Sequence, residues 1–457
     1  MEEGLYGEHR LPFGSGRQIA PAPPARVGPE DAAIGSLDSG EYQLLSSGGT
    51  FPRAAERMRE RVGRYAAAAL CCSLCALLGS QAAAQTEEEE PGATIELSGF
   101  LSASLFAQDR LFAPGNGQNA QHVTLDQDGP AGWWHGGDVR NTRLTLTASA
   151  PDAAGRWALG GTLELDLFGG FTAGGAFGPE QPLPRVRLAF VQGERGGTRL
   201  RLGQDWTPLA GHTPESVSHL AFPPGWGSTG VIGWRFPGLF LRHEVGTVGG
   251  ARVALQAAAF RGGWDDEDDP ARPSAGEAPV LPQLQARVDL DGELAGAVPW
   301  NVHLAGHFDR KVAPDAVAAV RDGQPDGRAL ALGARIDPDP LTLMGGGYLG
   351  RAVGHHAAHI SQFGDIRGWG AWLQGGVAFL ERWSGWLFLG LDDPRDGDIE
   401  AGQALGNRLA NAMLRFDAGP AEIGLEWMHA RTEWRQATEG SVARRGNQLI
   451  LGALLSF

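Results

Sequence analysis

The carboxy-terminal segment, residues 447–457 (NQLILGALLSF), alternates with a period of two up to its last residue. Counting back from Phe457 in steps of two gives an unbroken apolar row: Leu455, Ala453, Leu451 and Leu449. The residues between them are mixed in polarity. One fully apolar face at this period is typical of a strand whose outer side meets lipid. The alternative is a buried edge strand of a soluble β-protein, and the upstream segments decide between the two.

No apolar run in the chain reaches the roughly 18 residues that a membrane-spanning helix needs. Only helices and closed barrels satisfy every backbone polar group in lipid, so a membrane protein of this kind must be a barrel. Charged residues make up 20% of the chain, and the mean hydropathy is -0.20. This polar balance agrees with a barrel because every second strand residue faces water.

A short apolar stretch, Tyr65–Gly79, follows four arginines and precedes three alanines that end at Ala84. A basic region, a short apolar region and small residues predict a Sec-type signal peptide over residues 58–84, cleaved near Ala84. A short buried helix is the alternative. All three cysteines lie inside this stretch, so the exported chain is predicted to contain no disulfide.

Composition and periodicity give the bounds of the other three parts of the chain. Residues 1–57 are rich in Gly, Pro and Ser and show no period, so we predict a disordered extension, which a misplaced start site would explain. Residues 85–93 form a short acidic linker, and residues 94–457 form the barrel. The formal charge of −15 and the single lysine, Lys311, exclude a nucleic-acid-binding protein, which needs a basic face.

From residue 94 onward, alternating segments are separated by breaks rich in Gly, Pro and Asp. The connections alternate between short ones (151–155, 194–197, 247–250, 292–298, 337–340, 381–382 and 419–420) and longer ones (107–138, 169–183, 207–229, 262–280, 310–326, 351–367, 392–406 and 434–445). Short turns on one side and long loops on the other are typical of an outer-membrane barrel. We therefore predict an all-β, transmembrane, antiparallel barrel of about sixteen strands, with short periplasmic turns and long extracellular loops. The count treats Val231–Val245 as one strand across Pro237 and Gly238.

Strand parity places a set of charged residues on the lumen side of the predicted wall: Arg143, Glu164, Asp166, Arg185, Arg187, Arg199, Arg201, Asp205, Arg242 and Glu244. Guanidinium groups beside carboxylates would create a transverse field that orients and selects ionic solutes. The excess of arginine favours anions. The alternative is that these residues form ion pairs that only hold the wall together.

The connection Thr207–Thr229 carries more apolar residues than a loop in water needs, among them Leu209, Phe222 and Trp226. Folding into the barrel would explain them, and His212, Glu215 and His219 would then lie at a constriction. A contact between subunits is the competing explanation.

Two further hypotheses, a metal site and a hydrolase, have less support in the sequence. The run His355, His356 and His359 leaves metal binding open as an alternative, but it has no carboxylate or cysteine at ligand spacing, so no metal ligands are assigned. A hydrolase would need a serine beside a histidine, and Ser216 with His212 or His219 is the nearest grouping. No G-x-S-x-G elbow accompanies them, so we predict a protein that is not an enzyme and has no cofactor.

Residues 140–206 resemble the trimeric outer-membrane porins, most closely the DcaP-like group. The resemblance rests on four runs: RNTRLTLTASAP, GGTLELDLFGG, PRVRLAF and RLRLGQDWTPL. In that family these runs are an Arg-led strand, an acidic strand, an R-x-R strand and a strand end before an inward-folding third loop. The resemblance implies that the arginines at 185, 187, 199 and 201 line the pore opposite Glu164 and Asp166. It also implies a homotrimer, whereas the family's helical amino-terminal extension has no counterpart in QTEEEEPGAT.

We therefore expect a porin in the outer membrane of a Gram-negative bacterium, passing small hydrophilic, preferentially anionic solutes. A channel specific for phosphate, dicarboxylate or sugar is the nearest alternative, followed by a structural or adhesive barrel and then a lipid hydrolase. The expected partners are the solutes, outer-membrane lipid with lipopolysaccharide, and the barrel-assembly machinery, which would recognise Phe457.

Overall fold

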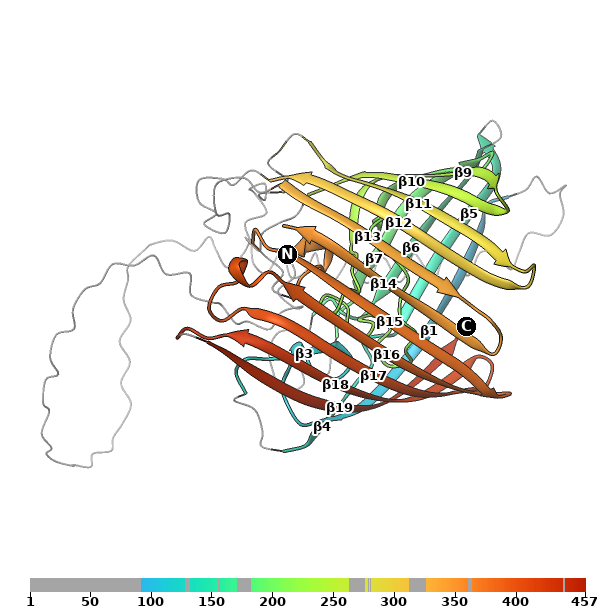
Figure 1. Ribbon diagram of the computed structural model, residues 1–457. Helices are drawn as coiled ribbons and strands as arrows, with labels where there is room; N and C mark the ends of the chain where they lie inside the picture. The colour runs from blue at the N-terminus through green and yellow to red at the C-terminus, as the bar shows by residue number, and fades with distance from the viewer. Residues whose placement is uncertain are drawn as a thin grey trace, which may run out of the picture. The chain divides into compact units, whose positions relative to one another are not determined.

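The computed structural model is shown in Figure 1. The structure describes residues 92–127, 132–154, 157–170, 182–262, 276–277, 279, 281–311, 326–360, 364–438 and 440–457. The predicted extension and signal peptide lie outside the described residues, as does most of the predicted linker. Among the described residues, no helix is long and apolar enough to cross a membrane.

Sixteen long strands form the wall in the described part of the chain. They are β1 (Thr94–Gln108), β5 (Arg143–Ala154), β6 (Trp157–Asp166), β7 (Arg185–Arg195), β8 (Thr198–Trp206), β9 (Arg235–Val248), β10 (Ala251–Phe260), β11 (Gln283–Leu294), β12 (Val298–Arg310), β13 (Asp326–Ile336), β14 (Leu341–Arg351), β15 (Arg367–Leu380), β16 (Trp383–Pro394), β17 (Ala404–Asp417), β18 (Ala421–Arg435) and β19 (Ser441–Ser456).

Each of these strands pairs antiparallel with its neighbours in sequence, and β19 pairs with β1 to close the ring. In that last pair Leu101 lies opposite Leu455 and Leu105 opposite Leu451. Closure satisfies the backbone groups that an open sheet edge would leave exposed. The predicted closed antiparallel barrel of sixteen strands is confirmed.

The apolar row at the carboxy-terminus lies on the outer face of the barrel. Leu449, Leu451 and Leu455 are 41%, 46% and 47% exposed, whereas Gln448 and Ile450, on the opposite face of the strand, are buried. Around the ring, most exposed large side chains of the strands are leucines. An apolar outer belt of this kind is the surface that a barrel presents to lipid.

Three boundaries differ from the sequence-based prediction. A short strand, β4 (Trp134–Asp138), lies inside the predicted loop 107–138 and pairs with the end of β1, ahead of β5. The predicted long connection 434–445 spans only residues 436–440, because β18 and β19 extend further than their alternation suggested. Strand β9 begins at Arg235 rather than at residue 231, although it does continue through Pro237 and Gly238 as predicted.

Some aromatic residues near strand ends face inward, contrary to a simple interfacial girdle. Trp369 and Phe379 are exposed on the outer face, but Phe168, Phe190 and Phe260 are buried. Phe168 packs on Phe222, with ring centroids 5.1 Å apart. Through this contact, Phe168 packs on the connection between β8 and β9, to which Phe222 belongs.

Within the first long connection, β2 (Phe112–Pro114), η2 (Gly117–Asn119) and β3 (Ala120–Val123) pack on the inner side of the wall. The Val123 N–H donates to the Thr432 hydroxyl at 2.9 Å. The Trp434 indole N–H donates to the Val123 carbonyl at 3.0 Å. This segment therefore narrows the lumen from the side of β17 to β19.

Candidate functional site

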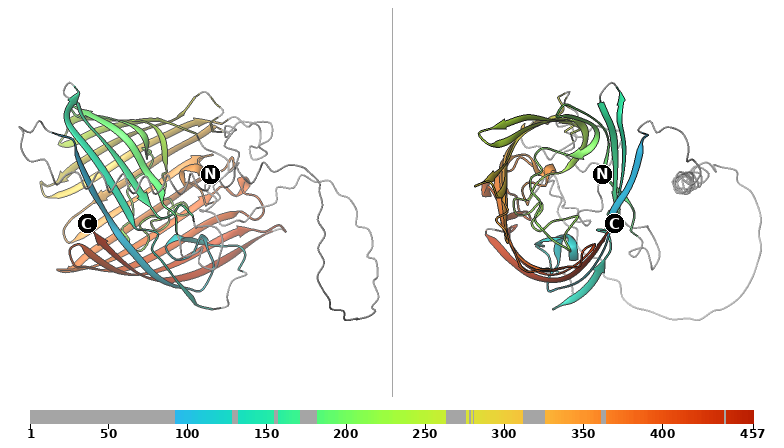
Figure 2. Two further views of the ribbon diagram at one scale, coloured as in Figure 1. Left: turned by 180° about the vertical axis from the view of Figure 1, so that it is seen from behind. Right: turned by 90° about the vertical axis from the view of Figure 1, so that its right-hand side faces the viewer.

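Residues 207–234, called the inward segment below, join β8 to β9 and lie inside the ring of strands (Figure 2). Leu209, Val217 and His219 of this segment are fully buried, and Phe222 is nearly so. The segment packs on lumen-facing side chains of the wall, away from the outer surface where a contact between subunits would need it. Its apolar side chains are thus buried within the barrel.

One carboxylate holds the centre of the inward segment. Glu426 on β18 accepts hydrogen bonds from the Ser216 hydroxyl at 2.8 Å, the Val217 N–H at 2.7 Å and the Ser218 N–H at 3.1 Å. Its other oxygen lies 3.2 Å from Nδ1 of His219. Glu426 lies between the outward-facing Leu425 and Trp427, so strand alternation aims it into the lumen.

The contacts of Ser216, His219 and Glu426 do not form the catalytic triad of a hydrolase. The Ser216 hydroxyl donates to the Glu426 carboxylate and accepts the backbone N–H of His219 at 2.7 Å. A nucleophilic serine instead needs a histidine ring to take its proton, with the carboxylate behind that ring. Ser216, His219 and Glu426 are buried as well, so the grouping fixes a segment of backbone and offers no site for a substrate.

Buried amide side chains satisfy the backbone of the inward segment. Gln374 on β15 accepts the Glu215 N–H at 2.6 Å and donates to the Glu215 carbonyl at 2.9 Å. Three further amides act in the same way: Gln285 toward Leu209, Asn141 toward Ser218 and Ala221, and Gln121 toward Phe222 and Gly225. Buried backbone groups require such partners, so these contacts dock the segment in one position.

Two wall glycines allow the inward segment to approach closely. A Cβ added at Gly424 on β18 would lie 2.9 Å from Cβ of Val217, and one added at Gly452 on β19 would lie 3.1 Å from Cβ of Ser218. Real Cβ atoms do not pack at 2.9 Å, so a larger residue at Gly424 must displace the segment.

The variant Gly424→Val is therefore expected to raise single-channel conductance by dislodging residues 216–219, at a cost of about 1–3 kcal/mol from overpacking. Conductance in planar bilayers is the measurement. Gly375→Val is the matched control, because its nearest neighbour would be Leu343 Cδ1 at 3.6 Å, an ordinary contact. Equal conductance in both variants would contradict the packing argument.

The predicted charged residues on β5 to β7 form one buried network. Arg187 contacts Glu164 at 2.6 Å and Asp166 at 3.1 Å, and Arg185 contacts Asp166 at 2.7 Å. Arg143 lies 3.7 Å from Glu164. The register between β6 and β7 shifts beside Glu164, which brings both arginines of β7 to the carboxylates of β6. Because Arg187 is only 3% exposed, this network presents little of its charge to water.

We expect Arg187→Met to lower the free energy of unfolding by about 3 kcal/mol. The substitution removes a buried arginine and leaves Arg143, at 3.7 Å, as the remaining ion-pair partner of Glu164 among the described residues. Urea unfolding followed by the heat-modifiable migration of the barrel measures this loss. Arg199→Met serves as the control, since Arg199 and its partner Glu194 are both partly exposed and such pairs contribute at most about 1 kcal/mol. A loss no larger than that of the control would refute the assignment.

Other arginines on the lumen side are partly exposed. They are the predicted Arg199, Arg201 and Arg242, together with three that the sequence analysis missed: Arg287, Arg335 and Arg415. Arg335 lies between Ala334 and Ile336, and Arg415 between Leu414 and Phe416. The parity rule that selected Arg143 would have selected these as well.

On β8 and β9, Arg201 and Arg242 are more exposed than their acidic partners. Arg201 contacts Asp205 at 2.7 Å, with the side chains 27% and 9% exposed. Arg242 lies 3.5 Å from Asp289, with the side chains 34% and 5% exposed. This part of the wall therefore presents positive charge to the lumen. Glu244 is also exposed, near the short-turn end of β9.

Glu215 of the inward segment lies between two arginines of the wall. Its carboxylate lies 3.3 Å from Arg415 and 3.7 Å from Arg335. All three side chains are partly exposed. His212 stacks edge-on with His303, with ring centroids 5.0 Å apart. Burial, with Arg287 and Arg335 nearby, lowers the pKa of His212 below its ordinary value and favours the neutral ring.

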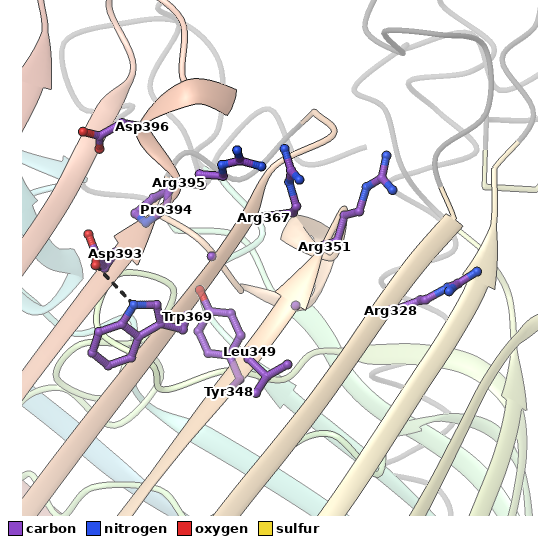
Figure 3. A pocket seen from close by; sticks show the side chains of 12 residues that line it. Arg328, Tyr348, Leu349, Arg351, Arg367, Trp369, Asp393, Pro394, Arg395 and Asp396 are labelled. Atoms are coloured by element: carbon purple, nitrogen blue, oxygen red, sulfur yellow. Dashed lines mark hydrogen bonds between the residues drawn. The ribbon is translucent and has the colours of Figure 1, made fainter.

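A separate pocket of about 1010 Å³ lies at the long-connection end of β13 to β16 (Figure 3). Arg328, Arg351 and Arg367 point along its rim above the outward-facing Leu349 and Trp369. Each of the three arginines contacts a carboxylate: Asp326, Asp365 and Asp398, respectively. Because these charges are paired and lie on the outer side, the pocket is no part of the lumen surface.

A closed antiparallel barrel of sixteen strands, apolar outside and partly filled by its third long connection, has the fold of outer-membrane porins. Two examples among solved structures share this fold. The outer-membrane channel DcaP of Acinetobacter baumannii aligns with a TM-score of 0.61 at 17% identity, covering 81% of this chain and 99% of that one. The anion-selective porin from Comamonas acidovorans aligns with a TM-score of 0.51 at 15% identity, covering 80% of this chain and 100% of that one.

At these identities the likeness establishes the fold, in agreement with the resemblance of residues 140–206. No family model and no curated protein matches the chain.

Proposed function

We propose that this protein is a bacterial outer-membrane porin through which small hydrophilic solutes diffuse passively, with a preference for anions. The observation that carries the preference is the unequal exposure within two ion pairs, Arg201 with Asp205 and Arg242 with Asp289. Arg201 and Arg242 reach into the lumen while Asp205 and Asp289 stay buried behind them. The two porins described above have the same fold, and one of them is described as anion-selective.

The proposed selectivity arises from the field of the exposed arginines in the lumen. Arg201 and Arg242 expose positive charge on β8 and β9. Glu215 of the inward segment is paired with both Arg335 and Arg415 and does not offset this charge. Such a field orients solutes and raises the local concentration of those that the positive wall attracts. The buried network of Arg187 and Asp166 contributes to this wall mainly by holding it rigid.

Reversal potentials in planar bilayers under a salt gradient test the proposal. We expect conductance with a potential of the sign that anion preference produces. Absence of conductance would exclude any channel, and a preference for cations would contradict the role of the exposed arginines. Saturable block of the current by phosphate, a dicarboxylate or a sugar would instead favour a substrate-specific channel.

The proposal extends to the surroundings of the barrel. The apolar outer belt suits outer-membrane lipid with lipopolysaccharide, and the resemblance to trimeric porins leads us to propose a homotrimer. Export through residues 58–84, cleavage near Ala84 and recognition of Phe457 by the barrel-assembly machinery remain predictions. Amino-terminal sequencing of the outer-membrane fraction and the mass of the purified protein in detergent test the cleavage site and the trimer.

A further inference from the structure

Three imidazole rings converge where the connection between β14 and β15 packs on the wall. His355 and His356 belong to the short turn η4 (Gly354–His356), and His307 lies on β12. One ring nitrogen of each residue lies within 4.8 Å of those of the other two. Ring centroids are 4.3 Å apart for His355 and His356, and 4.6 Å apart for His307 and His356. His307 on β12 thus adds a third imidazole ring to the two histidines of η4.

The surroundings of these rings are polar and closed. Gln283 Oε1 lies 2.9 Å from Nε2 of both His355 and His356. The Asp309 carboxylate lies 3.7 Å from Nε2 of His307 and 3.7 Å from Nε2 of His355. Within the described part of the chain, Nε2 of His307 and Nδ1 of His356 are buried and have no hydrogen-bond partner. Nε2 of His356 faces the Gln283 oxygen, so its Nδ1 carries a lone pair that a bound ion would use. His307 would first have to give up the Gln285 amide that donates to its Nδ1.

The residue types at this cluster suit a metal ion. Neutral imidazole nitrogens are typical ligands of Zn²⁺ and poor ligands of Ca²⁺ and Mg²⁺. Asp309 supplies negative charge beside them, although it also binds Lys311 Nζ at 2.7 Å. The Lys311 ammonium therefore competes with the ion for this carboxylate.

We propose that His307, His355 and His356 form a Zn²⁺ site, with Asp309 or a water molecule at the fourth position. Ligand nitrogens around a tetrahedral Zn²⁺ are roughly 3.4 Å apart, given bonds of about 2.0–2.1 Å. The three rings therefore have to approach one another by roughly 1.4 Å at most, which small side-chain rotations provide.

The site would also fasten the inward segment. The His356 carbonyl accepts the Gly233 N–H at 2.7 Å, near one end of the segment. An ion held by His307 and His356 would tie this end of the segment to β12 and η4. This inference does not depend on which solutes the barrel passes.

Zinc titration of the full-length protein in detergent, after treatment with EDTA, tests the proposal. We expect isothermal calorimetry and metal analysis to show one Zn²⁺ per chain. Thermal stability should rise with ZnCl₂ but not with MgCl₂ or CaCl₂. His356→Gln should weaken binding by more than about 100-fold, because even loss of a supporting partner costs 10- to 100-fold.

His359→Gln is the matched control, since His359 is buried in the same connection but bonds to the Tyr348 hydroxyl at 3.1 Å, away from the three rings. Its affinity for Zn²⁺ should equal that of the unmodified protein. If His356→Gln does not fold, X-ray absorption at the zinc edge of the unmodified protein decides. Three imidazole nitrogens at about 2.0–2.1 Å support the site. Absence of Zn²⁺ uptake, or equal uptake by a folded His356→Gln, would overturn the proposal.

Discussion

Glu426→Ala is expected to release the inward segment from the wall and to raise single-channel conductance while the barrel stays closed. The carboxylate accepts bonds from the Ser216 hydroxyl and from two successive backbone N–H groups, and it contacts the His219 ring. Hydrogen bonds to charged groups contribute about 1.5–3 kcal/mol each, and they are not additive. We expect a loss of at least about 3 kcal/mol in the docking free energy of the segment.

Single-channel recording measures the rise in conductance that release of the segment would cause. Protease sensitivity of residues 207–234 provides a second readout. Glu422→Ala is the control on the same strand, because Glu422 is partly exposed and contacts only Arg415, at 3.6 Å, among the described residues. Glu426→Gln should give an intermediate result, since it keeps the shape of the acceptor and removes its charge. Unchanged conductance and protease resistance in Glu426→Ala would show that the buried amides hold the segment without it.

Neutralising the exposed lumen arginines in the double variant Arg201→Gln and Arg242→Gln is expected to reverse the preference for anions. Asp205 then loses its ion-pair partner, whereas Asp289 keeps Arg287 at 2.6 Å, so the lumen loses two exposed positive charges. Coulomb's law in water gives roughly 0.4 kcal/mol per charge at about 10 Å, so two charges change anion partitioning about fourfold and cation partitioning about fourfold in the other direction. The reversal potential under a salt gradient measures this change.

The effect should shrink in concentrated salt, because the screening length falls to about 3 Å at 1 M. Arg328→Gln is the control, since this residue is an exposed arginine on the outer side near the pocket of Figure 3. Its removal should leave the reversal potential unchanged. A shift in the control as large as in the double variant would mean that selectivity does not arise from the lumen wall.

The fold was largely predictable because side chains alternate along every strand. The closing pair of β1 and β19 follows from the apolar faces of both segments, and the sixteen strands follow from the alternation of short and long connections. The short strand β4 (WHGGD) escaped detection because two glycines leave little pattern to read. The last connection was predicted too long because Ser441–Gly446 is polar although it is paired with β18.

The lumen was predictable in part. Arg201 and Arg242 were selected by parity and do reach the interior, whereas Arg187 is buried between two carboxylates. Parity places a charge on one side of the wall, but it does not say whether a neighbouring strand will neutralise it. That depends on register, and the shift beside Glu164 between β6 and β7 leaves no local sequence mark.

Sequence alone therefore determined which face of the wall most strand residues occupy, because the period of two is a property of the backbone itself. Only the tertiary structure decided which side chains meet across the lumen. Glu426 lies 210 residues from Ser216, and His307 lies on another strand from His355 and His356. Such pairs depend on how the closed ring brings distant strands and connections together, and no local pattern encodes that distance.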